Sequence, residues 1–219
     1  GYSNYAGIID HVEAEYVPTT QKYSFSVTFK KASNNKLPNG FWLATSDGPN
    51  PKGKSGELPI FYFDASRSTP VLTAYGYNGK NDGSSWYDGA ETPGNQAPDK
   101  IASSKVTSNF IENINVSSTS TRRTMSFSIR GAIVNNYVPN NQTSSPWTGL
   151  DFASKFGIWF HPLQDMSTSY GHDGFLTSLH KGREGYLDLF DENTTPVPEP
   201  ATITVLALGA IAALRRRSK

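Results

Sequence analysis

A ten-residue segment at positions 21–30, QKYSFSVTFK, alternates apolar and polar side chains without interruption. Its apolar set is Tyr23, Phe25, Val27 and Phe29. Successive side chains of a β-strand point to opposite faces, so this period of two predicts a strand with one buried and one exposed face. Residues 122–131, RRTMSFSIRG, repeat the pattern with the apolar set Met125, Phe127 and Ile129. These two segments constrain the chain to a fold built from half-buried strands.

Further candidate strands, some of them fully apolar, extend this interpretation along the chain. They lie at 8–17, 41–43, 60–63, 70–77, 157–160 and 183–190, separated by clusters rich in Gly, Pro, Asn and Asp that end strands. We expect 8–17 to pair with 21–30 across the turn PTTQ, and a short helical turn at 132–138 or 149–155. Eight to eleven short strands predict an all-β fold, an antiparallel, jelly-roll-like β-sandwich.

The C-terminal segment differs from this body. We divide the chain into a β-sandwich at 1–192, a Pro-rich linker at 193–200 and an apolar helix with a basic cap at 201–219. The apolar run from Ala201 to Leu214 would span about 21 Å as a helix, less than the ~30 Å hydrocarbon core of a bilayer. The expected membrane segment includes Ala201, Leu206, Leu208, Ile211 and Leu214, and the basic cap is Arg215, Arg216 and Arg217. An amphipathic helix docked on the body is the alternative, but the run is apolar all round.

Charge and cysteine content exclude several classes of function. The formal net charge is +1, but the tail holds four of the 20 basic residues, Arg215, Arg216, Arg217 and Lys219, and one of the 19 acidic residues, Glu199. The body is therefore slightly acidic and offers no electrostatic case for binding nucleic acid. The absence of cysteine excludes disulfides, thiolate metal sites and a cysteine nucleophile.

The order of parts in the tail carries a family resemblance. Val-Pro-Glu-Pro at 197–200, a short apolar helix and a terminal arginine cluster resemble the PEP-CTERM sorting signal of Gram-negative bacteria. The resemblance implies an exported protein that is held briefly in the inner membrane, with its basic cap in the cytoplasm, and processed by an exosortase. Pro198, Glu199 and Pro200 would be the residues that the exosortase recognises. We attribute the missing N-terminal leader to truncation.

The destination implied by the resemblance is the cell envelope or the extracellular matrix of a bacterium that makes exopolysaccharide and biofilm. The body contains none of the common catalytic sequence motifs. We therefore expect a non-enzymatic structural or carbohydrate-binding protein whose partners are an exosortase and an exopolysaccharide. A secreted polysaccharide hydrolase or lyase on a jelly-roll scaffold is the alternative, and a sheath or filament subunit is a third class.

Histidines and acidic loops are the candidate metal ligands. His161, His172 and His180 lie within twenty residues, together with Asp165 and Asp173, but their spacing fits no common metal-ligand pattern, and we interpret them as surface-loop and strand-end histidines. The acidic residues Asp47, Asp82, Asp88 and Glu91 lie in loops, where calcium is a possible ligand but Asp-Gly is also ordinary turn chemistry. We expect no cofactor, with calcium left open.

Aromatic residues in loops are the candidate glycan-binding residues, because sugar faces stack on aromatic rings. Trp86 and Tyr87 lie between clusters of small polar residues, and Trp147 lies in the loop SSPWTG. The alternative is that these rings fold back and cap the ends of the sandwich. Trp42 and Trp159 lie inside apolar strand runs, and we assign them to the core.

Overall fold

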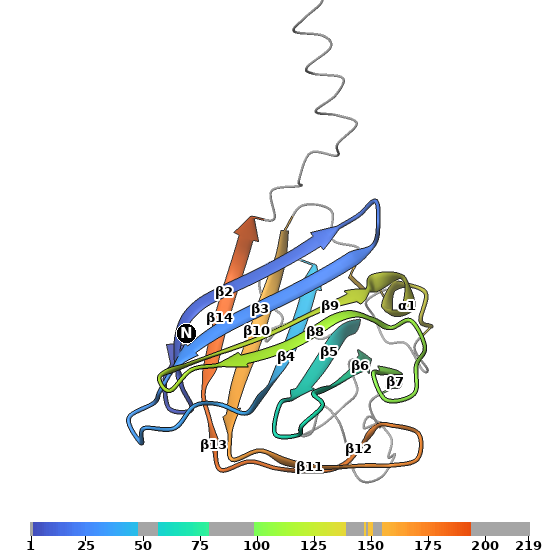
Figure 1. Ribbon diagram of the computed structural model, residues 1–219. Helices are drawn as coiled ribbons and strands as arrows, with labels where there is room; N and C mark the ends of the chain where they lie inside the picture. The colour runs from blue at the N-terminus through green and yellow to red at the C-terminus, as the bar shows by residue number, and fades with distance from the viewer. Residues whose placement is uncertain are drawn as a thin grey trace, which may run out of the picture.

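The computed structural model describes residues 2–47, 57–78, 99–138, 147, 149–150 and 155–193, and these form almost entirely antiparallel strands (Figure 1). The strands are β1 (Tyr2–Ser3), β2 (Ile8–Val17), β3 (Lys22–Lys30), β4 (Gly40–Asp47), β5 (Glu57–Asp64), β6 (Val71–Asn78), β7 (Asp99–Ser103), β8 (Ile111–Ser118), β9 (Arg122–Arg130), β10 (Lys155–Gln164), β11 (Ser167–Tyr170), β12 (Leu176–His180), β13 (Arg183–Glu184) and β14 (Tyr186–Asn193). The one helix in these residues is α1 (Gly131–Asn135). The antiparallel all-β prediction is confirmed.

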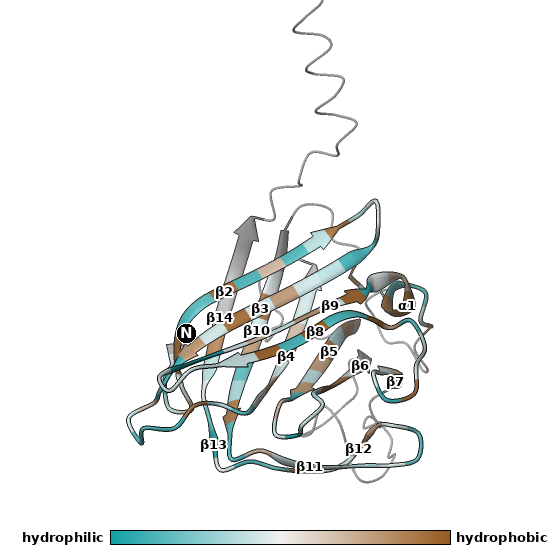
Figure 2. Ribbon diagram, in the orientation of Figure 1, coloured by the Kyte–Doolittle hydropathy of each residue, from teal (hydrophilic) through white to brown (hydrophobic). Residues whose placement is uncertain are grey.

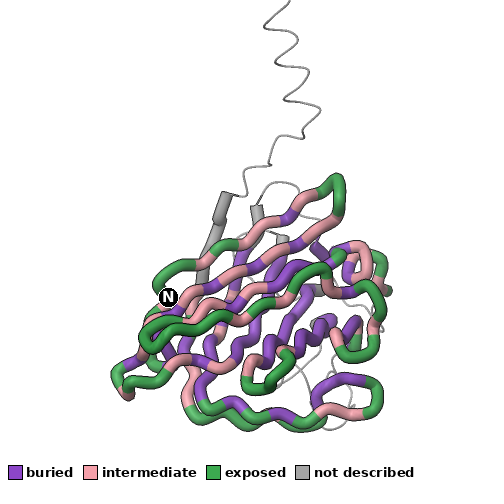
Figure 3. Tube along the Cα trace, viewed as in Figure 1, coloured by how far each residue is buried: buried purple, intermediate pink, exposed green. Residues whose placement is uncertain are grey.

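A four-stranded sheet has the order β2-β3-β9-β8. Its first pair runs from Ile8 opposite Lys30 to Val17 opposite Lys22, so the predicted hairpin between 8–17 and 21–30 is confirmed. Burial alternates residue by residue along β3, as the sequence pattern requires (Figure 3). The same alternation appears in hydropathy (Figure 2).

The larger sheet has the order β1-β14-β10-β4-β5-β6-β7, and the short strand β13 also pairs with β10. Strands β4 to β7 follow one another in sequence and in space. The chain passes from one sheet to the other four times, after β1, β3, β7 and β9. Figure 1 shows the four-stranded sheet lying across the larger sheet.

The main core lies between these two sheets and is dominated by aromatic rings. Tyr23 of β3 stacks on Phe61 of β5 with ring centroids 5.8 Å apart, and Phe25 lies 5.4 Å from Phe41 of β4. Phe127 of β9 contacts rings from both sheets. Burying one such ring contributes roughly 1.5–3 kcal/mol, so this layer is the principal source of stability.

A second, smaller core covers the outer face of the larger sheet. The hairpin β11–β12 and the turn before β12 lie over this face. Phe175 packs edge-on against Tyr75 of β6 at 5.4 Å, and the Leu176 amide donates a hydrogen bond to the Tyr75 hydroxyl at 2.9 Å. Strands β4, β5 and β6 are thus buried on both faces, which explains their continuous apolar runs.

Several boundaries differ from those predicted. The segment 183–190 is two strands, β13 and β14, separated at Gly185. Strand β10 continues to Gln164, so His161 lies inside a strand, and its assignment as a surface-loop or strand-end histidine is wrong. His180 ends β12 and is exposed, as expected. No helix of the described residues is long and apolar enough to cross a membrane.

Candidate functional site

Four aromatic rings from neighbouring strands form a row on the outer face of the larger sheet. Tyr62 of β5 lies opposite Trp42 of β4, and Trp42 lies opposite His161 of β10. The row ends at Tyr186 of β14, whose ring centroid is 6.3 Å from that of His161. Trp159 of β10 packs edge-on against Trp42 at 4.8 Å. We call these five residues the outer aromatic cluster.

The exposure of the cluster increases toward β14, the strand next to the edge strand β1. Tyr62 is 2% exposed, Trp42 is 9% exposed and Tyr186 is 39% exposed. Trp159 and His161 are half-buried between these extremes. The buried rings fix the positions of the exposed ones, so the cluster presents an ordered aromatic edge to solvent.

A single carboxylate holds the centre of the cluster. Glu184 Oε1 accepts a hydrogen bond from Trp42 Nε1 at 2.9 Å and lies 2.9 Å from His161 Nδ1. Its other oxygen, Oε2, pairs with the Lys181 ammonium group. Strand β13 positions Glu184, which lies opposite Leu163 of β10.

The electrostatic environment keeps Glu184 ionised. Partial burial raises the pKa of its carboxyl group, but hydrogen bonds from His161, Lys181 and Trp42 outweigh burial and lower the pKa to about 2. His161 also has a buried atom, Nε2, that has no hydrogen-bond partner within the described part of the chain. The cluster thus combines aromatic faces with a fixed negative charge.

Tyr5 and Arg183 form a cation–ring pair outside the row. The Arg183 guanidinium group lies 4.5 Å from the centroid of the Tyr5 ring, and Tyr5 is 55% exposed. Strand β13 carries Arg183 directly before Glu184. Successive side chains of a strand point to opposite faces, and Arg183 lies opposite Gln164 whereas Glu184 lies opposite Leu163, so Arg183 points away from the face that carries the cluster.

Such a surface can bind polyhydroxylated ligands. The C–H face of a sugar ring packs on an aromatic ring as other apolar surfaces do, and nearby polar groups hydrogen-bond its hydroxyls. The exposed ring of Tyr186 offers the apolar contact. Lys181, whose ammonium group pairs with Glu184, offers a donor near the cluster.

Trp147, a residue we expected in a glycan site, lies at the end of the main core. Its indole Nε1 donates a hydrogen bond to the Val134 carbonyl oxygen at 3.0 Å, and its ring packs edge-on against Tyr137 with centroids 5.9 Å apart. The ring is partly buried against the core. Its role in glycan binding stays a prediction. Trp86 and Tyr87 lie outside the described residues.

The structure separates the histidines and acidic residues that we considered as metal ligands. His161 contacts Glu184, whereas Asp165 pairs with Lys36 and Asp173 pairs with Lys100. Within the described ranges, no three His, Cys, Asp or Glu side chains gather to hold a metal ion. Asp82, Asp88 and Glu91 lie outside those ranges, as does the whole tail with Pro198, Glu199 and Pro200.

Sequence reasoning missed the outer aromatic cluster because it assigned Trp42 and Trp159 to the core. That assignment holds for Trp42, whereas Trp159 is only half-buried. One signal was present: Trp159 and His161 are two residues apart and so share one face of a strand.

Comparison with known proteins identifies the tail. Residues 196–218 match the PEP-CTERM protein-sorting motif. No curated protein and no solved structure matches the chain. The sorting motif, confined to this segment, implies an exported protein that an exosortase processes and sorts to the cell surface.

Proposed function

We propose that this exosortase-sorted protein is a non-enzymatic component of the cell envelope or exopolysaccharide matrix that binds polysaccharide through its outer aromatic cluster. The observation that carries the proposal is the row Trp42–His161–Tyr186, whose exposed end is Tyr186 of β14, the strand next to the edge strand β1. Stacking on pre-positioned rings costs little conformational entropy, because the buried members already fix the geometry.

The charge state of the cluster favours binding over hydrolysis. A glycosidase needs a carboxylic acid whose pKa is raised so that it can protonate the leaving group. The pKa of Glu184 is lowered instead, to about 2, and both of its oxygens are engaged by neighbouring side chains. A polysaccharide hydrolase or lyase remains the alternative, and its test is the size of the polymer.

We also propose the route and scaffold that this function needs. The run from Ala201 to Leu214 anchors the protein briefly in the inner membrane, with Arg215–Arg217 in the cytoplasm as the positive-inside rule favours. The body is a jelly-roll-like sandwich, an interpretation supported by four passages of the chain between two facing sheets. Cleavage near Pro198–Pro200 would release the body to the matrix.

Co-sedimentation of the full chain with the source organism's exopolysaccharide and with insoluble cellulose tests the binding site. We expect Trp159→Ala and Tyr186→Ala to lower the bound fraction at least threefold, while Val106→Ala, a truncation of an exposed apolar side chain outside the cluster, leaves it unchanged. Equal binding by wild type and Trp159→Ala, or no binding at all, overturns the site. Shortened polymer or new reducing ends would show an enzyme.

A deletion tests the sorting route separately. Removing residues 197–219 should redistribute the protein among inner membrane, envelope and medium in cell fractionation. Substituting Glu199→Ala alone should leave the anchor but block processing, so the unprocessed chain accumulates in the inner membrane. An unchanged distribution in both variants would contradict processing at this motif.

A further inference from the structure

A pocket of about 450 Å³ lies beside the turn between β5 and β6, apart from the outer aromatic cluster. Its walls come from the turn residues 67–70, from Ser104 and Lys105 after β7, and from Ile111 and Ile114 of β8. This volume is within the range of sites for small ligands. Two of the lining residues, Arg67 and Lys105, are cations, and no lining residue is acidic.

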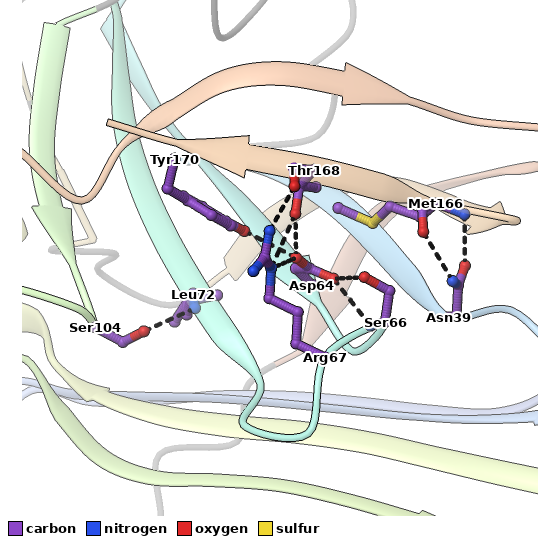
Figure 4. Close-up of polar contacts among 9 residues, drawn as sticks. All are labelled: Asn39, Asp64, Ser66, Arg67, Leu72, Ser104, Met166, Thr168 and Tyr170. Carbon is purple, nitrogen blue, oxygen red and sulfur yellow. Dashed lines mark hydrogen bonds and ion pairs between the residues drawn. The ribbon is translucent and has the colours of Figure 1, made fainter. Parts of the chain in front are cut away.

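Arg67 is held rigidly at this pocket (Figure 4). Its Nε donates a hydrogen bond to Asp64 Oδ2 at 3.1 Å, and its Nη2 donates to the Thr168 carbonyl oxygen. The guanidinium carbon lies 5.0 Å from the centroid of the Tyr170 ring. Among the described residues, Nη1 has no hydrogen-bond acceptor, and the side chain is 40% exposed. The guanidinium group is therefore fixed on one edge and open on another.

The carboxylate that holds Arg67 lies behind the pocket. The side chain of Asp64 is 0% exposed, and it does not line the pocket. Besides Arg67, it accepts hydrogen bonds from the Ser66 amide at 2.9 Å, the Ser66 hydroxyl at 2.6 Å and the Tyr170 hydroxyl at 3.2 Å. These contacts fix Asp64 and, through it, the position of Arg67, whose Nη1, unpaired in the part of the chain that the structure describes, is the part of the guanidinium group that remains open to a ligand.

Lys105 supplies a second positive charge to the same space. It is exposed, and its ammonium nitrogen lies 5.5 Å from the centroid of the Tyr170 ring, whose face Arg67 also approaches. No carboxylate among the described residues pairs with it. A guanidinium group with a free edge binds a carboxylate in a directed way, and a nearby ammonium group adds an undirected charge.

We propose that this pocket binds the carboxylate of an acidic sugar, such as a uronic acid residue of a polysaccharide. Arg67 and Lys105 bind the carboxylate, the hydroxyls of Ser68 and Thr69 meet those of the sugar ring, and Ile111 and Ile114 face its apolar side. The combination of two cations, small hydroxyls and an apolar wall fits a charged sugar better than a bare ion, which needs no apolar wall. The site does not depend on the outer aromatic cluster.

Isothermal titration calorimetry of the full chain tests the site with trigalacturonate as the probe. The methyl ester of the same trisaccharide removes the charge and keeps the sugar, and inorganic phosphate supplies charge without the sugar. We expect trigalacturonate to bind at least tenfold more tightly than either control, with an affinity that falls as NaCl is raised. If the methyl ester binds as tightly as trigalacturonate, the pocket does not recognise the carboxylate charge. If phosphate binds as tightly as trigalacturonate, the pocket does not recognise the sugar.

Matched substitutions assign the binding to these two cations. Lys105→Gln should weaken trigalacturonate binding about threefold to tenfold, and Arg67→Lys, which keeps the charge beside Asp64 but loses the planar fork, should weaken it more. Lys31→Gln makes the same charge change after β3 and lines neither described pocket, so it should bind like wild type. Equal affinities of Lys105→Gln and Lys31→Gln would overturn the proposal. Unchanged thermal midpoints would show that the variants are folded, and Trp159→Ala should leave this titration unaltered even if it abolishes binding to exopolysaccharide.

Discussion

The His161 ring stacks on the Trp42 ring, with centroids 4.0 Å apart and planes inclined by 15°. Both rings also contact the same oxygen of Glu184, each at 2.9 Å. Three side chains, from β4, β10 and β13, therefore hold one another in place as one unit. Their positions depend on the shared carboxylate as well as on strand pairing and ring stacking. This unit positions the exposed rings of the outer aromatic cluster.

Replacing Glu184 should lower the free energy of unfolding of the protein and should also make that free energy vary less with pH. The pKa of Glu184 falls from its ordinary value of 4.5 to about 2 in the folded protein, so the folded state favours the ionised form. That stabilisation is present above about pH 4.5 and is lost as the pH falls through about 2. We expect Glu184→Gln to lower the free energy of unfolding by about 1–2 kcal/mol at pH 7, a value reduced for solvent screening.

Urea unfolding at pH 7 and at pH 2 measures this effect. The difference between wild type and Glu184→Gln should shrink as the pH falls. Glu13→Gln is the control, because the Glu13 side chain is 71% exposed and contacts only the exposed His11 among the described ion pairs. A Glu184 effect that is no larger than the Glu13 effect would show that the carboxylate does not hold the cluster.

Asp64→Asn should cost more stability than the loss of an exposed ion pair. Burial raises the pKa of the Asp64 carboxyl group, but hydrogen bonds from Ser66 and Thr168 outweigh burial and lower the pKa overall. The substitution replaces an acceptor oxygen by a donor and leaves Arg67 without its counter-charge, so we expect a loss of about 2–4 kcal/mol at neutral pH. Chemical denaturation at pH 7 measures it.

The matched control for this substitution is Asp165→Asn. Asp165 pairs with Lys36, and both side chains are more than half exposed, at 52% and 55%. Exposed ion pairs contribute about 0–1 kcal/mol, so the control should be nearly silent. Similar losses in the two variants would mean that the Asp64 network is as solvent-screened as a surface pair.

The sequence predicted the strands whose two faces meet different environments. Strand β3 could be predicted from its sequence because one face meets the core and the other meets water. Strands β4 and β5 gave only apolar runs, because the β11–β12 hairpin covers their outer face and removes the alternation. The outer aromatic cluster and the Asp64 network could not be predicted from the sequence, since each joins residues far apart in the chain. Asp64, in FDASRSTP, has the appearance of an ordinary turn residue.

Gly40 should be intolerant of any side chain. A Cβ atom at this position would collide with the Met166 sulfur and lie 2.8 Å from the carbonyl oxygen of Phe63. Because a strand backbone cannot shift without breaking its ladder, we expect Gly40→Ala to destabilise by about 1–3 kcal/mol. Gly76→Ala is the control in the same sheet, since its nearest neighbour, Asp99 Cβ, is at 3.5 Å. Thermal unfolding should show a lower midpoint for Gly40→Ala alone, and an equal response of the two would refute the packing argument.

Two substitutions of Trp147 separate a capping role from a glycan-binding role. Trp147→Phe keeps an aromatic ring but loses the hydrogen bond to the Val134 carbonyl. If Trp147 caps the core, the free energy of unfolding should therefore fall by about 1 kcal/mol. Trp147→Ala also loses the ring that packs on Tyr137, for a total of about 2–4 kcal/mol. Denaturation and polysaccharide co-sedimentation of the same preparations report the two roles independently. Lower stability with unchanged binding assigns Trp147 to the cap. Normal stability with lost binding would move the glycan site from the outer aromatic cluster to this end of the sandwich.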